Sequence, residues 1–191
     1  MANSDIPSGF KPVKTLNGAA WNGQANVYYI PATDAVAMFK GDAVKSAGSA
    51  DATGMTPTVA QVAAGDAVRG VIIGFGTDPN IMINPDSPNA VHRAASTAMY
   101  CLVVDDPNVI FEVQDAGTAA AANVGLSADI VVGTGNTTTG KSAMEVSGTK
   151  AVGAATLKCL RLVNREDNAL GANAKWEVLF AEHEMKLATG V

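Results

Sequence analysis

The sequence predicts an all-β fold, a β-sandwich or jelly-roll-like arrangement or a small barrel of about ten short strands, with an extended N-terminal arm. Composition is the first reason. Of the 191 residues, 48% are hydrophobic but only 5% are aromatic, and Ala, Gly, Val and Thr are abundant. Small and β-branched residues suit strands and tight turns better than long helices. The second reason is the alternation of short apolar runs with clusters of Gly, Pro, Asn and Asp.

Residues 1–25 form the expected arm, because Pro and Gly recur there too often for a helix. Large apolar side chains lie between these breakers, and a free tail would not carry so many of them. We therefore expect the arm to lie on its own sheet, on a neighbouring copy or on a partner. The candidate partner-binding residues of the arm are Phe10, Val13, Leu16 and Trp21.

A repeated four-residue sequence follows the first expected strand, Asn26–Ile30. Gly-Asp-Ala-Val occurs at 41–44 and again at 65–68, each time leading into an apolar run. Each Gly-Asp sequence is expected to form a turn directly before a strand. The two strands are therefore expected to be neighbours in a small barrel.

Two long segments between these strands are expected to be loops. Residues 46–58 are mostly small, and residues 77–90 contain three prolines without periodicity. Long loops on a β scaffold serve as contact surfaces or mobile insertions. Contiguous apolar side chains in the second loop predict an interface, so we add Ile81, Met82 and Ile83 to the candidate partner-binding residues.

Residues 97–115 read as a central β-hairpin. Two apolar runs flank Asp105-Asp106-Pro107-Asn108, in which Pro presets φ and the Asp and Asn side chains favour a turn. The other strands are expected to pack around this pair. Residues 26–191 are thus expected to form a single β domain, with possible sub-lobes at 26–90 and 91–191.

The remaining strands follow the central segment. The last two are expected to form a hairpin, since the polar segment that joins them, 164–174, is rich in Asn, Asp and Gly. The four strands predicted here are Ala128–Gly133, Ala143–Ser147, Thr156–Val163 and Lys175–Phe180.

The charge pattern disfavours nucleic acids and anionic membranes as partners. The net charge is −5 and no run of Lys or Arg occurs, whereas phosphate binding needs clustered cations. The apolar runs are far too short to span a bilayer, and the N-terminus lacks an apolar signal core, so intracellular synthesis without export is expected. Cys101 and Cys159 lie in apolar strands and are expected to be free buried thiols.

One segment matches the phosphate-binding P-loop pattern. Gly135–Ser142 reads GNTTTGKS and follows an apolar strand. A P-loop must lead directly into the N-terminus of a packed helix. The residues that follow include Gly148 and Gly153, which disfavour a helix. A surface loop is the expectation, with nucleotide binding as the alternative.

The sequence offers no catalytic centre, metal site or cofactor site. His92 and His183 are far apart and lack metal-ligand spacing, and no nucleophile elbow or Cys/His pair occurs. We therefore do not expect an enzyme, and we expect no cofactor.

Several motifs together resemble a known protein family. These are Trp21-Asn22-Gly23, the paired Gly-Asp-Ala-Val turns, the central 102–114 segment (LVVDDPNVIFEVQ) and the closing 168–179 segment (NALGANAKWEVL). They resemble the head decoration, or capsid cement, proteins of tailed bacteriophages. That family consists of small acidic β proteins that bind as dimers or trimers to the outside of an expanded capsid.

The resemblance implies a structural protein on the capsid exterior of a virion. Its partners would be the major capsid protein and other copies of itself, as a closed trimer or a dimer. Binding only to the assembled shell would stabilise that shell by mass action. Two alternatives remain open: a nucleotide-binding protein that uses Gly135–Ser142, and a β-sandwich adhesin or carbohydrate-binding module that uses its few aromatic residues.

Overall fold

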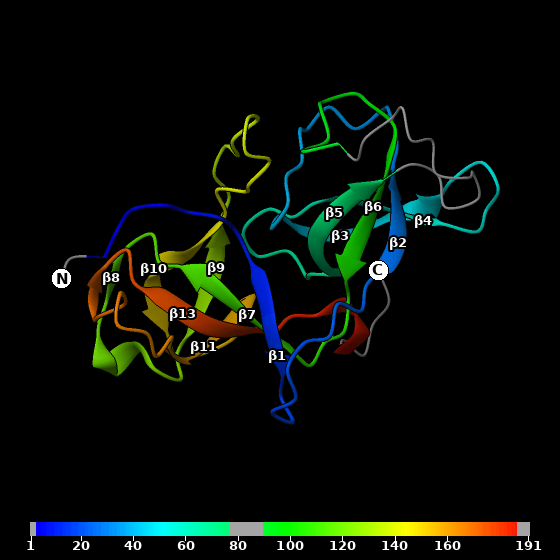
Figure 1. Ribbon diagram of the computed structural model, residues 1–191. Helices are drawn as coiled ribbons and strands as arrows, with labels where there is room; N and C mark the ends of the chain where they lie inside the picture. Colours follow the sequence, from blue (N-terminus) through cyan, green and yellow to red (C-terminus); the bar gives the residue numbers. More distant parts are fainter. Residues whose placement is uncertain (1–2, 77–89, 187–191) are drawn as a thin grey trace.

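Two curled β-sheets lie side by side in the structure (Figure 1). The computed structural model describes residues 3–76 and 90–186. The prediction of an all-β fold is confirmed, since short 3-10 turns at Ala121–Asn123 (η1) and Glu184–Lys186 (η2) are the helical segments of the described residues. The strands are β1 (Lys11–Thr15), β2 (Asn26–Ile30), β3 (Ala43–Ala50), β4 (Pro57–Gln61), β5 (Gly70–Gly76), β6 (Met99–Val104), β7 (Val109–Gln114), β8 (Thr118–Ala119), β9 (Ser127–Val131), β10 (Glu145–Ala151), β11 (Leu157–Leu162), β12 (Gly171–Ala172) and β13 (Lys175–Phe180).

The first sheet is a closed barrel in the order β2-β4-β3-β5-β6. β2 pairs antiparallel with β6 over its whole length, and a parallel contact between Tyr29 and Thr58 joins it to β4. Alternate residues of each strand point inward, so the barrel encloses its own small core. That core contains Tyr28, Ile30, Met38, Val44, Val59, Ile72, Phe75, Cys101 and Val103.

The repeated Gly-Asp turns form the same structure twice, as predicted. Asp42 accepts a hydrogen bond from the backbone N–H of Phe39 at 2.9 Å, and Asp66 accepts one from that of Ala63 at 2.7 Å. Each carboxylate thus reaches back three residues and closes the turn before a strand. The strands that follow, β3 and β5, pair with each other in the barrel.

The loop expected over 46–58 is much shorter than predicted. β3 continues to Ala50 and β4 begins at Pro57, which leaves only the turn between them. Asp51 closes that turn, because its N–H donates to the carbonyl of Thr56 at 2.9 Å and its carboxylate accepts from the Thr53 hydroxyl at 2.7 Å. The small residues that suggest a loop sit in the more exposed half of β3, where a strand needs little packing.

The second sheet has six strands in the order β1-β7-β13-β11-β9-β10 and curls until its edge strand β10 meets the end of β7. The backbone N–H of Ala116 donates to the carbonyl of Val146 at 2.9 Å across this seam. A Cβ atom on Gly117 would lie 2.5 Å from the Cα of Gly148. Glycine is therefore required where the two backbones approach most closely.

A buried ion pair holds the same seam together. Asp115 accepts hydrogen bonds from Lys150 Nζ at 2.7 Å and from Trp176 Nε1 at 2.8 Å, and the Asp115 and Lys150 side chains are both 0% exposed. The backbone N–H of Gly117 donates to the other carboxylate oxygen at 2.9 Å. With its hydrogen bonds satisfied in this way, the pair joins β13, β10 and the end of β7 without leaving a buried charge unpaired.

The prediction of a hairpin over 97–115 is wrong. β6 pairs with β2 and β5 in the barrel, whereas β7 pairs with β1 and β13 in the second sheet. The turn itself forms as expected, with Asp106 accepting from the N–H of Asn108 at 2.8 Å. The chain therefore crosses from one sheet to the other between Val104 and Val109. β6 is apolar on both faces, and β7 has one apolar face formed by Val109, Phe111 and Val113, so each strand is buried by its own set of neighbours.

The division of the chain also differs from the expected one. The barrel ends with β6 at Val104 and the second sheet continues from β7, so the boundary does not separate 26–90 from 91–191. Residues 1–25 are not a separate arm either, because β1 is a strand of the second sheet. The hairpin predicted for the last two long strands is confirmed, since β11 and β13 pair antiparallel.

Phe10 belongs to the core, so the prediction that it binds a partner is wrong. Its side chain is 1% exposed, and its ring lies 5.2 Å from that of Phe180 and 6.4 Å from that of Phe111. The same apolar cluster includes Ala43 and Val71 of the barrel. Phe10 therefore lies in a core that the two sheets share.

We predict that Phe10→Ala lowers the free energy of unfolding by about 3–5 kcal/mol, because it leaves a cavity between aromatic rings. Urea denaturation followed by circular dichroism measures this loss. The matched control is Ile6→Ala, at a side chain that is 63% exposed, which should change stability by less than about 0.5 kcal/mol. Equal effects of the two substitutions would contradict the assignment of Phe10 to the core.

Candidate functional site

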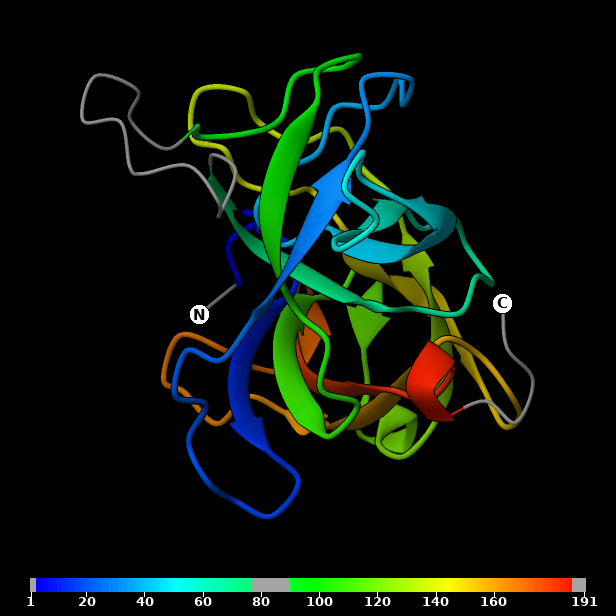
Figure 2. The same cartoon turned by 90° about the vertical axis from the view of Figure 1, so that its right-hand side faces the viewer.

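The segment from β1 to Trp21 forms a hairpin whose first strand belongs to the second sheet and whose tip projects beyond that sheet, and we call it the N-terminal hairpin (residues 11–21; Figures 1 and 2). The backbone N–H of Thr15 donates to the carbonyl of Ala19 at 2.9 Å, and that of Trp21 donates to the carbonyl of Val13 at 3.1 Å. Gly18 turns the chain at the tip with φ of +88°, a conformation that favours glycine.

The predicted partner-binding residues differ in exposure and in their place in the fold. Val13 and Leu16 lie on the N-terminal hairpin with exposed fractions of 38% and 51%. Trp21 is half-buried and packs against the shared core. Phe10 is buried, and Ile81, Met82 and Ile83 lie outside the described residues. Of the described candidates, the structure brings Val13, Leu16 and Trp21 together on one element.

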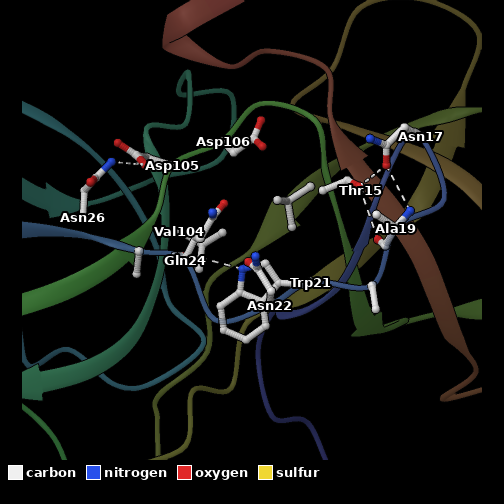
Figure 3. A pocket seen from close by; sticks show the side chains of 13 residues that line it. Thr15, Asn17, Ala19, Trp21, Asn22, Gln24, Asn26, Val104, Asp105 and Asp106 are labelled. Carbon is white, nitrogen blue, oxygen red and sulfur yellow. Dashed lines mark hydrogen bonds between the residues drawn. The ribbon is translucent and has the colours of Figure 1, made fainter.

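A pocket of about 490 Å³ lies on one side of the hairpin, and we call it the Trp21 pocket. Figure 3 shows the indole ring of Trp21 at its centre, with Asn17 and Thr15 toward the hairpin and Asp105 and Asp106 on the crossing segment. One part of the Trp21 side chain packs on the core and the rest lines the pocket. The pocket thus combines an aromatic surface with amide and carboxylate groups.

Hydrogen bonds hold the wall of the Trp21 pocket in place. Asp105 accepts from Asn26 Nδ2 at 2.8 Å and from the Tyr28 hydroxyl at 2.7 Å, and that hydroxyl in turn accepts from Arg69 Nε at 2.8 Å. Burial, followed by the hydrogen bond to Asp105, raises the pKa of Tyr28 to about 12. Tyr28 therefore stays neutral and acts as a fixed donor to Asp105 rather than as an acid or base.

A second hollow, of about 510 Å³, lies on the other side of the hairpin, where Leu16 faces Ile110 and Leu160. Glu177 lies at its edge and accepts from Lys14 Nζ and Arg161 Nε, with distances of 2.8 Å in both ion pairs. Burial alone would raise the pKa of Glu177, but the hydrogen bonds from these two cations outweigh it and lower the pKa. The hairpin is thus flanked by a hollow on each side.

The segment Gly135–Ser142 does not have P-loop geometry. It forms a turn in which Asn136 and Lys141 face each other, and the described residues after it form strand β10 instead of a helix. Its backbone is bonded to the barrel, since the N–H of Lys40 donates to the carbonyl of Gly140 and the N–H of Ser142 donates to the carbonyl of Lys40, both at 2.9 Å. The expectation of a loop is met, and the loop joins the two sheets.

The described residues contain no group of three or more His, Cys, Asp and Glu that would hold a metal ion. Cys101 and Cys159 are free and buried, as predicted. Burial raises the pKa of the Cys101 thiol to about 12 and that of Cys159 to about 11. Neither thiol is therefore poised to act as a nucleophile at neutral pH.

His183 is a buried histidine that the sequence did not single out as a core residue. Its Nδ1 accepts from the N–H of Met185 at 3.1 Å, and its Nε2 has no hydrogen-bond partner among the described residues. Burial lowers the pKa of His183, and the neighbouring cations Lys186 and Arg69 lower it further, against the smaller effects of Glu184 and Asp105. The folded state therefore favours the neutral imidazole.

Comparison with known proteins gives no relative, since no family model, curated protein or solved structure matches the chain. Within residues 3–76 and 90–186, no helix has the length and apolar character needed to cross a membrane. The interpretation of the site therefore depends on its geometry.

Sequence reasoning found Trp21 but not the polar residues around it. Asn17, Asn26 and Asp105 reach the pocket from the hairpin tip, from β2 and from the crossing segment. No sequence spacing connects these three positions. Trp21 itself was found because it is a large apolar residue in a segment broken by Gly and Pro.

We predict that the protein loses stability as the pH falls below the ordinary histidine range. The pKa of His183 is lower in the folded than in the unfolded state, so its contribution is full above pH 6.5 and is lost as the pH falls through the lower folded value. Urea unfolding at pH 7.5 and pH 5.5 measures the change. His183→Gln should show a smaller pH-dependent loss than the wild type, and an equal loss in both proteins would contradict the prediction.

Proposed function

We propose that this chain is a structural protein that binds the outside of a bacteriophage capsid and stabilises it by joining capsomers. The proposal places the protein on the capsid exterior of the virion after synthesis in the host cytoplasm, with the major capsid protein as its partner. The observation that carries the proposal is the N-terminal hairpin with its projecting tip, which exposes Val13 and Leu16 and is flanked by two hollows. Exposed apolar side chains on a projecting element are typical of an interface.

The base of the hairpin supports this role. β1 is hydrogen-bonded to β7, and Phe10, the residue directly before β1, is buried in the core. A contact element held in one conformation before binding loses little entropy when it docks. A ligand that binds only the assembled shell stabilises it by mass action, and many symmetric copies multiply a modest contact.

We predict that Leu16→Asp weakens binding to capsids. The substitution removes an apolar contact of about 1–2 kcal/mol and places a charge in the interface, so affinity should fall at least about ten-fold. Co-sedimentation with expanded shells of the phage that encodes the chain, stripped of this protein, measures the effect. The matched control is Val152→Asp, at a side chain that is 92% exposed and lies away from the hairpin. Equal binding by both variants would contradict the role of the hairpin.

The proposal includes self-association, as a closed trimer with a dimer as the alternative. A shallow apolar groove of about 440 Å³ supports it, because Val36 and Val132 line this groove and are 45% and 41% exposed. The prediction is a solution mass near three times the 19.4 kDa chain, or twice for a dimer, by light scattering at micromolar concentration. A mass near 19.4 kDa would contradict it.

A carbohydrate-binding module is the second candidate, and the Trp21 pocket favours it. An aromatic ring flanked by Asn17, Asn22, Gln24 and Asp106 offers stacking and hydrogen bonds of the kind that suit a sugar. If this candidate is correct, a glycan array gives a specific hit, and Trp21→Ala weakens that hit by about three- to ten-fold while Leu16→Asp does not. A blank array with intact capsid binding would reject it.

A further inference from the structure

A third hollow, of about 260 Å³, lies on the seam between the two sheets, and we call it the lysine pocket. Three lysines reach it from segments far apart in the sequence: Lys11 at the start of β1, Lys40 before β3 and Lys141 in the loop between β9 and β10. Pro12 and Ile73, both half-buried, form part of its apolar wall. Neither the capsid-binding nor the carbohydrate-binding proposal uses this pocket.

The backbone beneath the lysine pocket is fixed. The N–H of Phe10 donates to the carbonyl of Gly41 at 2.9 Å, which joins the start of β1 to the barrel. The backbone bonds between Lys40 and the 140–142 segment hold the third lysine beside the second. A Cβ atom on Gly9 would lie 2.4 Å from the carbonyl oxygen of Gly41, so the segments approach as closely as the backbone allows. The three lysine stems therefore start from fixed positions.

The pocket is a local concentration of positive charge in an acidic protein. Among the described residues, none of the three lysines forms an ion pair with a carboxylate. Lys11 is exposed overall, but the partial burial of its side chain lowers its pKa, and the positive charges of Lys141, Lys175 and Arg165 lower the pKa further, partly offset by Glu112. A bound anion would relieve this repulsion.

The backbone N–H groups around the pocket are already hydrogen-bonded, and this indicates which anion fits. A phosphate cradle is built from free backbone N–H groups, but those of Phe10, Lys40, Gly41 and Ser142 already donate to carbonyls. Ammonium groups on flexible stems remain available, beside an apolar wall. This combination suits a carboxylate that is followed by an apolar side chain.

We propose that the lysine pocket binds an acidic peptide segment of a protein partner, with Asp or Glu carboxylates contacting the three lysines and a neighbouring apolar side chain lying on Pro12 and Ile73. The charges are complementary, and the fixed backbone reduces the entropy lost on binding. The P-loop-like segment thus contributes a cation to the pocket without forming a nucleotide site. This proposal does not depend on capsid binding.

The test uses the full chain and a fluorescein-labelled peptide, acetyl-Leu-Glu-Glu-Leu-Glu-Glu-amide, in a fluorescence anisotropy titration. Lys11→Gln, Lys40→Gln and Lys141→Gln should each weaken binding by about three- to five-fold, and the triple variant should abolish it. Binding should also weaken as salt rises. The matched control Lys186→Gln removes the same charge from an exposed residue outside the pocket and should leave the affinity unchanged.

Three results would overturn the proposal. Equal affinity for the peptide in which Gln replaces every Glu would show that carboxylates are not recognised. An equal loss in Lys186→Gln would show attraction to net charge instead of a site. Competition by inorganic phosphate at lower concentration than free glutamate would assign the pocket to phosphate. Circular dichroism and thermal melting confirm that the variants are folded, which is expected because the three lysines are exposed.

Discussion

The packing of Phe10 between the two sheets is the contact on which the rest of the structure depends. Its ring lies against those of Phe111 and Phe180, which are themselves 5.1 Å apart, and the cluster continues into the barrel through Ala43 and Val71. Because Phe10 is fixed there, β1 is held on the second sheet and the N-terminal hairpin projects from a rigid base. The same anchoring brings Lys11 to the seam beside the loop at 135–142.

Much of the fold could be predicted because its strands carry local signals. Asn26–Ile30 and Lys175–Phe180 have the predicted bounds, and the repeated Gly-Asp turns identified two neighbouring strands. The prediction of a hairpin over 97–115 was wrong because turn-forming residues determine only the turn and not which strands pair. Asp106 closes the turn in the same way whether the strands on either side pair with each other or diverge into two sheets. Phe10 was misassigned because its Pro and Gly neighbours conceal a core residue in a segment without periodicity.

The candidate sites depend more on tertiary structure than the fold does. Val13, Leu16 and Trp21 could be selected as candidates from the sequence, since large apolar residues in a segment broken by Gly and Pro suggest an interface, and their binding role remains a proposal. The amides and carboxylates of the Trp21 pocket, and the three lysines on the seam, come from segments with no sequence relationship. Only the crossing of the chain between Val104 and Val109 and the folding of β1 onto the second sheet bring them together.

The central claim is that two sheets share one core through the N-terminal segment, and differential scanning calorimetry tests it most directly. A shared core makes the sheets unfold cooperatively, so the account predicts one transition whose calorimetric and van't Hoff enthalpies agree. Two resolved transitions, or a van't Hoff enthalpy well below the calorimetric one with no change in the association state, would contradict it. In that case the barrel and the second sheet would be independent units, and Phe10 would belong to only one of them.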